Sequence, residues 1–220
     1  MNTPKKLIYL IMLITIFFIP FIGCQFSSPP ASEVALSYYK LLIHQDASQI
    51  ISLNIMDEKM SQLVIDNVNE NLRQQILSDL SVENRITLSD DQIYSIQEAY
   101  LALLKQLDCH AISSPNGNTQ IVTLTSSCVD FNTLTNNATQ LALNQVNISD
   151  YRQHADYLSD LIHAYIIHLI KGYETAKPLE ITQETHFVFT KKNGLWLPED
   201  YEAFTKELCM LIDYNESLQK

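Results

Sequence analysis

The stretch ITQETHFVFTKKNGLWLPED, residues 181–200, decides the fold more than any other part of the chain. Residues 181–190 alternate in character: Thr185, Phe187 and Phe189 fall on one face and His186 and Val188 on the other. A period of two predicts a β-strand whose faces meet different surroundings.

The dipeptide Asn193-Gly194 follows this strand and precedes Leu195-Trp196-Leu197. Asn-Gly favours the tight turn that joins two antiparallel strands, because both residues accept a positive φ. The sequence therefore predicts a hairpin near its end. We expect a last helical stretch to open at Pro198.

A second hairpin is expected upstream, where the β-rich segments 109–112 and 121–125 flank the turn-forming residues 113–118. Cys109 and Cys128 bracket this hairpin and are our preferred disulfide pair, against the alternative of two buried free thiols. The register leaves the pairing open. A two-residue turn at Asn116-Gly117 would set Cys109 opposite Leu124, whereas a wider loop would bring the two cysteines together.

Helical periodicity dominates the rest of the chain. One helix is expected to begin after Pro30 and to run to about Gln45, with a break near residues 46–48. A long amphipathic helix should follow over residues 56–76, and Ser89 with Gln92 forms a capping box that opens a third helix. Further helices are predicted over residues 134–146 and 149–170, the second of them stopping at Gly172.

This order of helices and hairpins predicts an α+β fold, cone-like, with several amphipathic helices packed on an antiparallel sheet. The length fits one globular domain over residues 31–220.

The N-terminus has the order of a secretory signal: Lys5 and Lys6, an apolar run over residues 7–19, and then Pro20. The run is shorter than the roughly 20 residues that span a bilayer. Phe21-Ile22-Gly23-Cys24 places a small residue directly before a cysteine.

This ending resembles the lipobox of bacterial lipoproteins. The resemblance implies that residues 1–23 are a signal peptide removed before Cys24, and that Cys24 is acylated with chains such as palmitate. Phe21 departs from the pattern, in which Leu is commonest. Residues 24–30 would then be the lipidated cysteine and a tether. A plain transmembrane anchor and a cleaved, unlipidated signal are the alternatives.

Removal of the signal takes two lysines and no acid, so the formal charge moves from −11 to −13. An acidic surface repels nucleic acid, and we expect no nucleic-acid partner. The expected partners are the bilayer, through Cys24, and an unknown protein or small ligand. Localisation is expected at the extracytoplasmic face of the cell membrane.

The mature chain is also similar to Gram-positive lipoproteins that carry a domain of unknown function, and to nuclear-transport-factor-2-like domains. The similarity rests on the opening helix over residues 31–46 and the closing strand Lys192-Asn193-Gly194-Leu195-Trp196. The long helix after Trp196 departs from the simplest version of that fold. The resemblance carries over no catalytic residue.

An aromatic set falls on elements that converge on one sheet face in a domain of this type. Core packing is favoured for it, and a ligand pocket is the alternative. Its members are Tyr38, Tyr100, Tyr165, Phe187, Phe189 and Trp196.

No metal site or cofactor is expected. His163 and His168 stand five residues apart, which places them about 140° apart around a helix, too far to share an ion. Glycine-rich phosphate loops and nucleophile elbows are missing from the sequence. We therefore expect a membrane-anchored, non-catalytic binding or interaction module. The alternatives are a small-ligand carrier or enzyme that uses a cavity of the cone, and a subunit of an envelope assembly.

Overall fold

The computed structural model describes residues 28–80, 88–147, 149 and 154–214. These residues form seven α-helices, one π-helical segment and four strands. In chain order they are α2 (Ala31–Tyr39), η1 (Lys40–His44), α3 (Ser48–Ser52), α4 (Glu58–Leu80), α5 (Asp90–Leu104), β1 (Cys109–Asn116), β2 (Thr119–Ser127), α6 (Phe131–Gln145), α7 (His154–Thr175), β3 (Thr182–Lys192), β4 (Leu195–Pro198) and α8 (Tyr201–Ile212).

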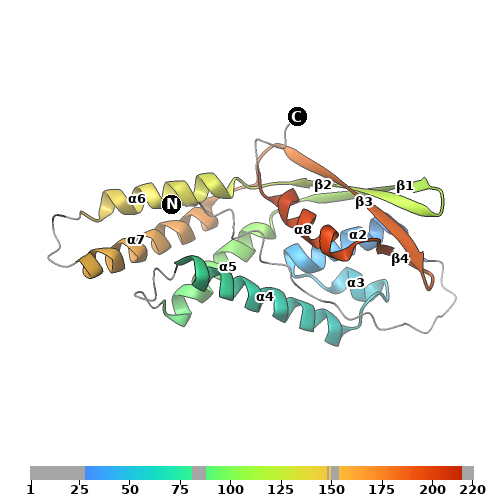
Figure 1. The fold of residues 1–220 in the computed structure, drawn as a ribbon, viewed down its shortest axis with the longest axis horizontal. Helices are drawn as coiled ribbons and strands as arrows, with labels where there is room; N and C mark the ends of the chain where they lie inside the picture. Colours follow the sequence, from blue (N-terminus) through green and yellow to red (C-terminus); the bar gives the residue numbers. More distant parts are fainter. Residues whose placement is uncertain (1–27, 81–87, 148, 150–153, 215–220) are drawn as a thin grey trace.

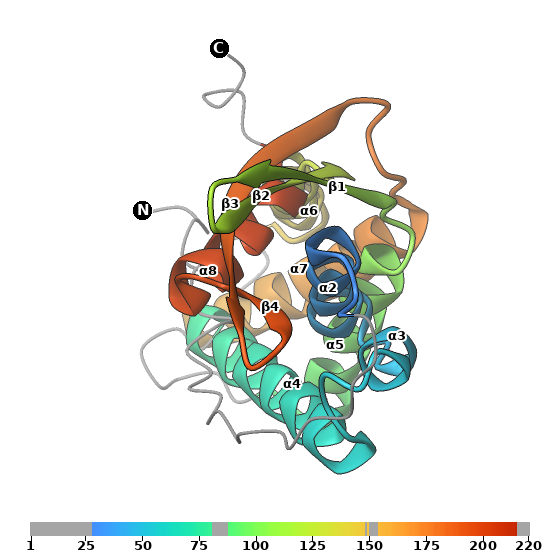
Figure 2. The same cartoon turned by 90° about the vertical axis from the view of Figure 1, so that its right-hand side faces the viewer.

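The strands form one antiparallel sheet in the order β1-β2-β3-β4. Helices α2 and α8 lie along one face of this sheet, and α4 crosses beneath them (Figures 1 and 2). Helices α6 and α7 run side by side away from the sheet, so the molecule is elongated. The predicted α+β fold is confirmed.

The two hairpins turn as their sequences require. Asn193 and Gly194 have φ values of 51° and 86°, and Lys192 pairs with Leu195, as predicted. In the first hairpin Asn116 pairs with Thr119, so the turn is Gly117-Asn118. Gly117 has a φ of 60°, and Asn118 does not have a positive φ, which is the pattern of a type II′ turn.

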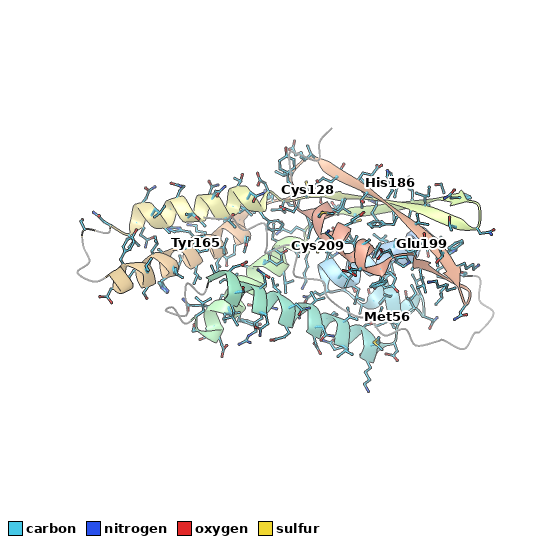
Figure 3. All side chains as sticks on the ribbon, viewed as in Figure 1. Met56, Cys128, Tyr165, His186, Glu199 and Cys209 are labelled. Carbon is cyan, nitrogen blue, oxygen red and sulfur yellow. The ribbon has the colours of Figure 1, made fainter. Side chains whose placement is uncertain are left out.

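This register makes the predicted disulfide wrong. Cys109 lies opposite Ser126, between the two registers that we considered, and Cys128 comes two residues further along the chain. Cys109, Cys128 and Cys209 are all free thiols. Cys128 lies where β2 leads into α6, and its sulfur is 3.8 Å from the carbonyl oxygen of Ile181 (Figure 3).

The core under the sheet is built around Phe204 of α8. Its ring centroid lies 4.6 Å from that of Phe187, 5.7 Å from Phe189 and 6.0 Å from Tyr38. Phe187 and Phe189 are buried whereas His186 and Val188 are exposed, which confirms the alternation expected from the sequence.

The first helix begins deep in this core, because Ala31 at the start of α2 is fully buried. The helix continues through η1 to Gln45, whose φ of 56° ends it. The Asp46 carboxylate then accepts a hydrogen bond of 2.9 Å from the Ser48 backbone N–H at the start of α3. The predicted helix end and break are both confirmed.

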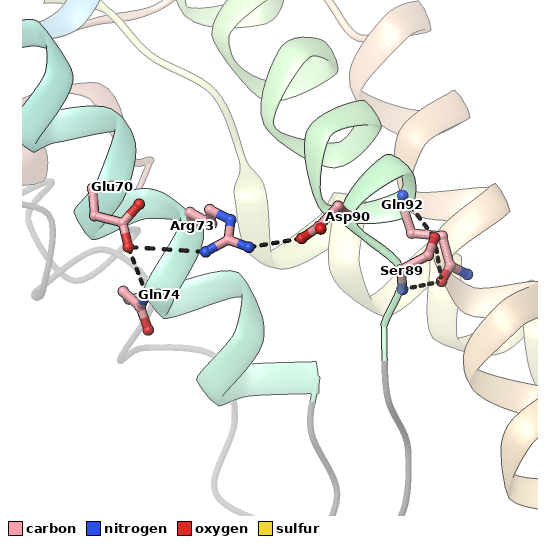
Figure 4. Close-up of polar contacts among 6 residues, drawn as sticks. All are labelled: Glu70, Arg73, Gln74, Ser89, Asp90 and Gln92. Atoms are coloured by element: carbon pink, nitrogen blue, oxygen red, sulfur yellow. Dashed lines mark hydrogen bonds and ion pairs between the residues drawn. The ribbon is translucent and has the colours of Figure 1, made fainter.

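Polar contacts join the end of α4 to the start of α5 (Figure 4). Arg73 Nη2 lies 2.7 Å from Asp90 Oδ1, and Arg73 Nη1 lies 3.9 Å from Glu70. Ser89 and Gln92 form the predicted capping box. Since Asp90 is 87% exposed, the ion pair contributes at most about 1 kcal/mol to stability.

Helices α6 and α7 pack through a small cluster of buried residues, Ala142, Val146 and Ala164. The predicted helix stop at Gly172 is wrong, because α7 continues to Thr175. Gly172 does not have the positive φ of a C-terminal cap. The helix ends just before Pro178, whose ring disfavours a helical conformation in the residue ahead of it. The predicted start of this helix falls partly on residues 150–153, outside the described residues.

Candidate functional site

A half-open groove of about 360 Å³ lies between the first half of β3 and the last turns of α8. Residues 182–185 of β3 form one wall, and Glu207, Met210 and Leu211 of α8 form the other. Its volume is at the lower end of the range of ligand sites in proteins. Both polar and apolar side chains face it.

Helix α8 is fixed in place along this groove by its ends and its buried face. Asp200 caps its start, accepting a 2.9 Å hydrogen bond from the Ala203 backbone N–H. Phe204, Leu208 and Leu211 are buried, and Glu207 is only partly buried. The amphipathic pattern therefore turns Glu207 toward the groove.

Two side chains of β3 reach across to α8 and define the groove wall. The Thr185 hydroxyl donates a hydrogen bond of 2.9 Å to Glu207 Oε2. Gln183 Nε2 donates to the backbone carbonyl oxygens of Leu211 at 3.2 Å and Asp213 at 2.9 Å. The Gln183 amide thus holds the C-terminal end of α8 against the start of β3.

The backbone of β3 is paired on one side only along this groove. Strand β3 pairs with β2 from Thr182 to Thr190. Pairing with β4 covers only Phe189 to Lys192, and one further bond runs from the Glu199 N–H to the Val188 carbonyl oxygen. Within the described residues, the opposite edge of β3 before Val188 makes no backbone hydrogen bond.

Glu184 and His186 lie on this same half of β3, on the outer face of the sheet. His186 Nε2 is 3.4 Å from Glu184 Oε1, and His186 Nδ1 is 2.9 Å from the Thr123 hydroxyl. Figure 3 shows His186 at the outer side of the sheet, away from Cys209 on α8. Glu184 thus borders the groove with its carboxylate on the outer face of the sheet, whereas the Glu207 carboxylate lies between β3 and α8.

Asp213 borders the end of the groove, and Gln183 bonds to its carbonyl oxygen. The pKa of its carboxyl group is raised from 3.8 to about 6, chiefly by burial; a hydrogen bond from the Phe131 backbone opposes this rise, and nearby Asp130 adds to it. Its Oδ1 atom is buried without a hydrogen-bond partner in the described part of the chain. Folding therefore makes this carboxyl group harder to ionise than an ordinary aspartate.

The predicted aromatic set falls into separate groups. Tyr38, Phe187 and Phe189 gather around Phe204 beneath the sheet. Tyr100 instead packs against Phe131 and Tyr173, with ring centroids 5.4 and 5.7 Å away.

The remaining two members of the set lie at opposite parts of the molecule. Tyr165 belongs to α7 and packs beside the cluster between α6 and α7, far from the sheet (Figure 3). Trp196 lies on β4 beneath the Lys191 ammonium group, which is 5.6 Å from its ring. None of the six residues lines the β3–α8 groove. Their role as a pocket stays a prediction.

The other residues named from the sequence are placed as follows. Cys24 lies outside the described residues. His163 Nδ1 contacts the Gln92 side chain at 3.2 Å, and His168 Nε2 contacts Gln145 Oε1 at 2.8 Å. In the part of the chain that the structure describes, no three His, Cys, Asp or Glu side chains gather as a metal site, and no helix has the length and apolarity to cross a bilayer.

The groove was not predicted from the sequence. One signal for it was present: Gln183 and Thr185 share the face of Phe187 and Phe189, yet they are polar where a covered strand would continue with apolar residues. The face of β3 therefore changes from core to groove between Thr185 and Phe187.

No family model matches the sequence, and a search of the curated proteins found no match. A search of solved structures found a crystal structure from Bacillus subtilis, of the protein YcdA, which is described as a "putative lipoprotein". The TM-score is 0.59 at 15% sequence identity, and the match covers 84% of this chain and 56% of YcdA. The two proteins share a fold, and the chain spans little more than half of that neighbour's length.

Proposed function

We propose that the protein is a lipid-anchored, extracytoplasmic binding module that holds its ligand in the β3–α8 groove and catalyses no reaction. The observation that carries the proposal is the groove itself, in which carboxylate, amide and hydroxyl groups lie beside the apolar Met210 and Leu211. Such a mixture suits recognition, because apolar contact gives affinity and polar groups give orientation.

The anchor is supported by the order of residues 5–24, in which two lysines and an apolar run lead to Gly23-Cys24. A fold shared with YcdA agrees with this placement. The likeness to nuclear-transport-factor-2-like domains, and to lipoproteins with a domain of unknown function, stays a prediction.

The packing of the aromatic side chains favours a surface groove over an interior ligand cavity. The rings around Phe204 and around Tyr100 contact one another at 4.6 to 6.3 Å between centroids. These are the separations of packed aromatic pairs.

The anchor is tested by expressing the full chain and its Cys24→Ser variant in a Gram-positive host fed an alkyne analogue of palmitate. We expect the wild type to carry the label and to sediment with membranes, and the variant to carry none. The thiols of Cys109, Cys128 and Cys209 are present in both chains, so the variant also reports any labelling of cysteines other than Cys24. Equal labelling of both chains would show that Cys24 is not the acylated residue.

The groove is tested by selecting displayed random decapeptides on the full chain in detergent micelles, with counter-selection on the Glu207→Lys, Met210→Glu double variant. Circular dichroism must first show that this variant is folded. We expect peptides that bind the wild type and not the variant. If every enriched peptide binds both proteins equally, or if none is enriched, the groove is not the binding surface.

A further inference from the structure

We infer that the groove receives an extended peptide segment that carries basic and apolar residues and adds as a further strand to the open edge of β3. This inference rests on the proposed function and names the class of its partner. Strand addition is a common mode of peptide recognition: backbone hydrogen bonds supply affinity and alternate side chains supply specificity.

The register determines which backbone groups would receive the added strand. In β3, Val188 directs its carbonyl oxygen toward the β4 side, where the Glu199 N–H binds it. Backbone direction alternates along a strand, and the pairing of β3 with β2 runs without a bulge from Thr190 to Thr182. The N–H and C=O groups of Thr182, Glu184 and His186 therefore point to the open edge.

Helix α8 leaves this edge accessible while it forms the opposite wall. Strand β4 ends at Pro198, and the chain then enters α8, which runs alongside the first half of β3 as far as Leu211. In Figure 1 the helix lies to one side of the strands, not in the plane of the sheet. The open edge spans roughly six residues, or about 20 Å at the usual rise of a strand.

The two outer edges of the sheet differ in how they are protected. Proteins commonly blunt exposed edges with proline, lysine or a covering element. The edge strand β1 carries Pro115. The open half of β3 carries neither proline nor lysine, since its residues from 182 to 188 are Thr, Gln, Glu, Thr, His, Phe and Val.

Charge and polarity select the side chains of the partner. The Glu184 side chain is half exposed on the outer face of β3, and Glu207 lies on the opposite side, between the strand and α8. Lysine or arginine at alternate positions, on the outer face of the added strand, would meet Glu184, in keeping with a mature chain of formal charge −13. The intervening side chains would point toward α8, where the partly exposed Met210 offers apolar surface.

The test uses the full chain in detergent micelles and a fluorescein-labelled decapeptide of alternating lysine and valine, with fluorescence anisotropy as the readout. Two further peptides carry N-methyl groups, one on all lysine amides and the other on all valine amides. An added strand donates to β3 from alternate residues only. We therefore expect one methylated peptide to bind about tenfold more weakly or worse, and the other to stay close to the parent.

Charge is tested with Glu184→Lys, an exposed position, and with Glu174→Lys on α7 as the matched control outside the groove. We expect Glu184→Lys to weaken binding about tenfold and Glu174→Lys to leave it unchanged. A peptide of alternating glutamate and valine should bind far more weakly than the lysine peptide.

Strand addition is overturned if the lysine–valine peptide does not bind, or if both methylated peptides bind as tightly as the parent. The outcome of the display experiment separates this failure from that of the proposed function. If peptides bind in the groove and still bind when either set of amides is methylated, the protein is a binding module but does not bind by strand addition. If no peptide binds in the groove, both the proposed function and strand addition are wrong.

Discussion

The sheet end of the molecule and the α6–α7 end are packed in different ways. Beneath the sheet, large rings meet at Phe204 and bury it to 1% exposure. Between α6 and α7 the buried residues are small, chiefly Ala142 and Ala164 with Val146 at 8% exposure. Aromatic burial contributes far more free energy per residue than alanine burial, because the apolar area removed from water is larger.

This difference suggests that the sheet end holds the fold and that the far end of the helix pair opens more easily. The near end of the pair is better attached, since Phe131 and Tyr173 pack on Tyr100 of α5. Local opening costs least where few apolar groups are buried. Four predictions test this comparison, from the largest expected effect to the smallest.

Truncation at the centre of the sheet core should have the largest effect. We expect Phe204→Ala to lower the free energy of unfolding by about 3 to 5 kcal/mol, since it leaves a cavity among four rings. Urea denaturation followed by circular dichroism measures the loss. A cost near 1 kcal/mol would show that the core does not depend on this ring. Phe204→Leu, which keeps most of the volume, should cost less.

Truncation of a buried side chain between α6 and α7 should lower the free energy of unfolding by less than truncation of Phe204. We expect Val146→Ala to lower the free energy of unfolding by about 1.5 kcal/mol, the value for two buried methylene equivalents. The same urea denaturation experiment measures it. Hydrogen exchange should also be faster for the amides of residues 138–145 than for those of β2. If Val146→Ala costs as much as Phe204→Ala, the proposed difference between the two ends is wrong.

The region that connects the sheet to the α6–α7 helix pair should make the free energy of unfolding depend on pH. Asp213 lies there, since Val129 beside α6 bridges to it. Its folded pKa of about 6 exceeds the usual 3.8, so its contribution to stability is fully present below pH 3.8 and is lost as the pH rises through 6.

We therefore expect Asp213→Asn to raise the free energy of unfolding at pH 7.5 by on the order of 1 kcal/mol, a value reduced for partial exposure. The gain should vanish at pH 4. Melting temperatures of both proteins at the two pH values measure it, with Asp200→Ala as a control that loses a helix cap instead. A gain that persists at pH 4 would show that titration of Asp213 is not its cause.

The smallest effect is expected from reductant. Because the register separates Cys109 from Cys128, dithiothreitol should leave the melting temperature unchanged. A mass that is two hydrogens lower without reductant, together with a lower melting temperature in its presence, would contradict the free thiols. Cys209, buried on α8, should react slowly with alkylating reagents, since burial also raises the pKa of its thiol to about 12.

The parts of the fold that followed from the sequence are those set by local chemistry. Asn193-Gly194 specifies its turn through two positive φ values, and Ser89 with Gln92 specifies a helix start. The alternation around Phe187 set the faces of β3. Each of these signals involves residues close together in the chain, so no tertiary information was needed.

The wrong predictions concern positions where the local sequence is compatible with more than one backbone conformation. The cluster Pro115-Asn116-Gly117-Asn118 permits more than one turn, and a shift of one residue in the turn moved the partner of Cys109 by two. Gly172 permits a helix end but does not require one. The groove could not be predicted because it joins residues 182–185 to α8, and only tertiary packing brings Thr185 to Glu207.

The buried start of α2 limits how far the domain can stand from a membrane. Ala31 is fixed in the core, so with Cys24 as the lipid anchor only seven peptide units separate the bilayer from the folded body, a reach of roughly 25 Å at full extension. The negative charge of the domain would repel anionic headgroups and favour the outer part of that reach. A partner would then have to bring its segment close to the bilayer surface, because a domain held on so short a tether could not search the space beyond it.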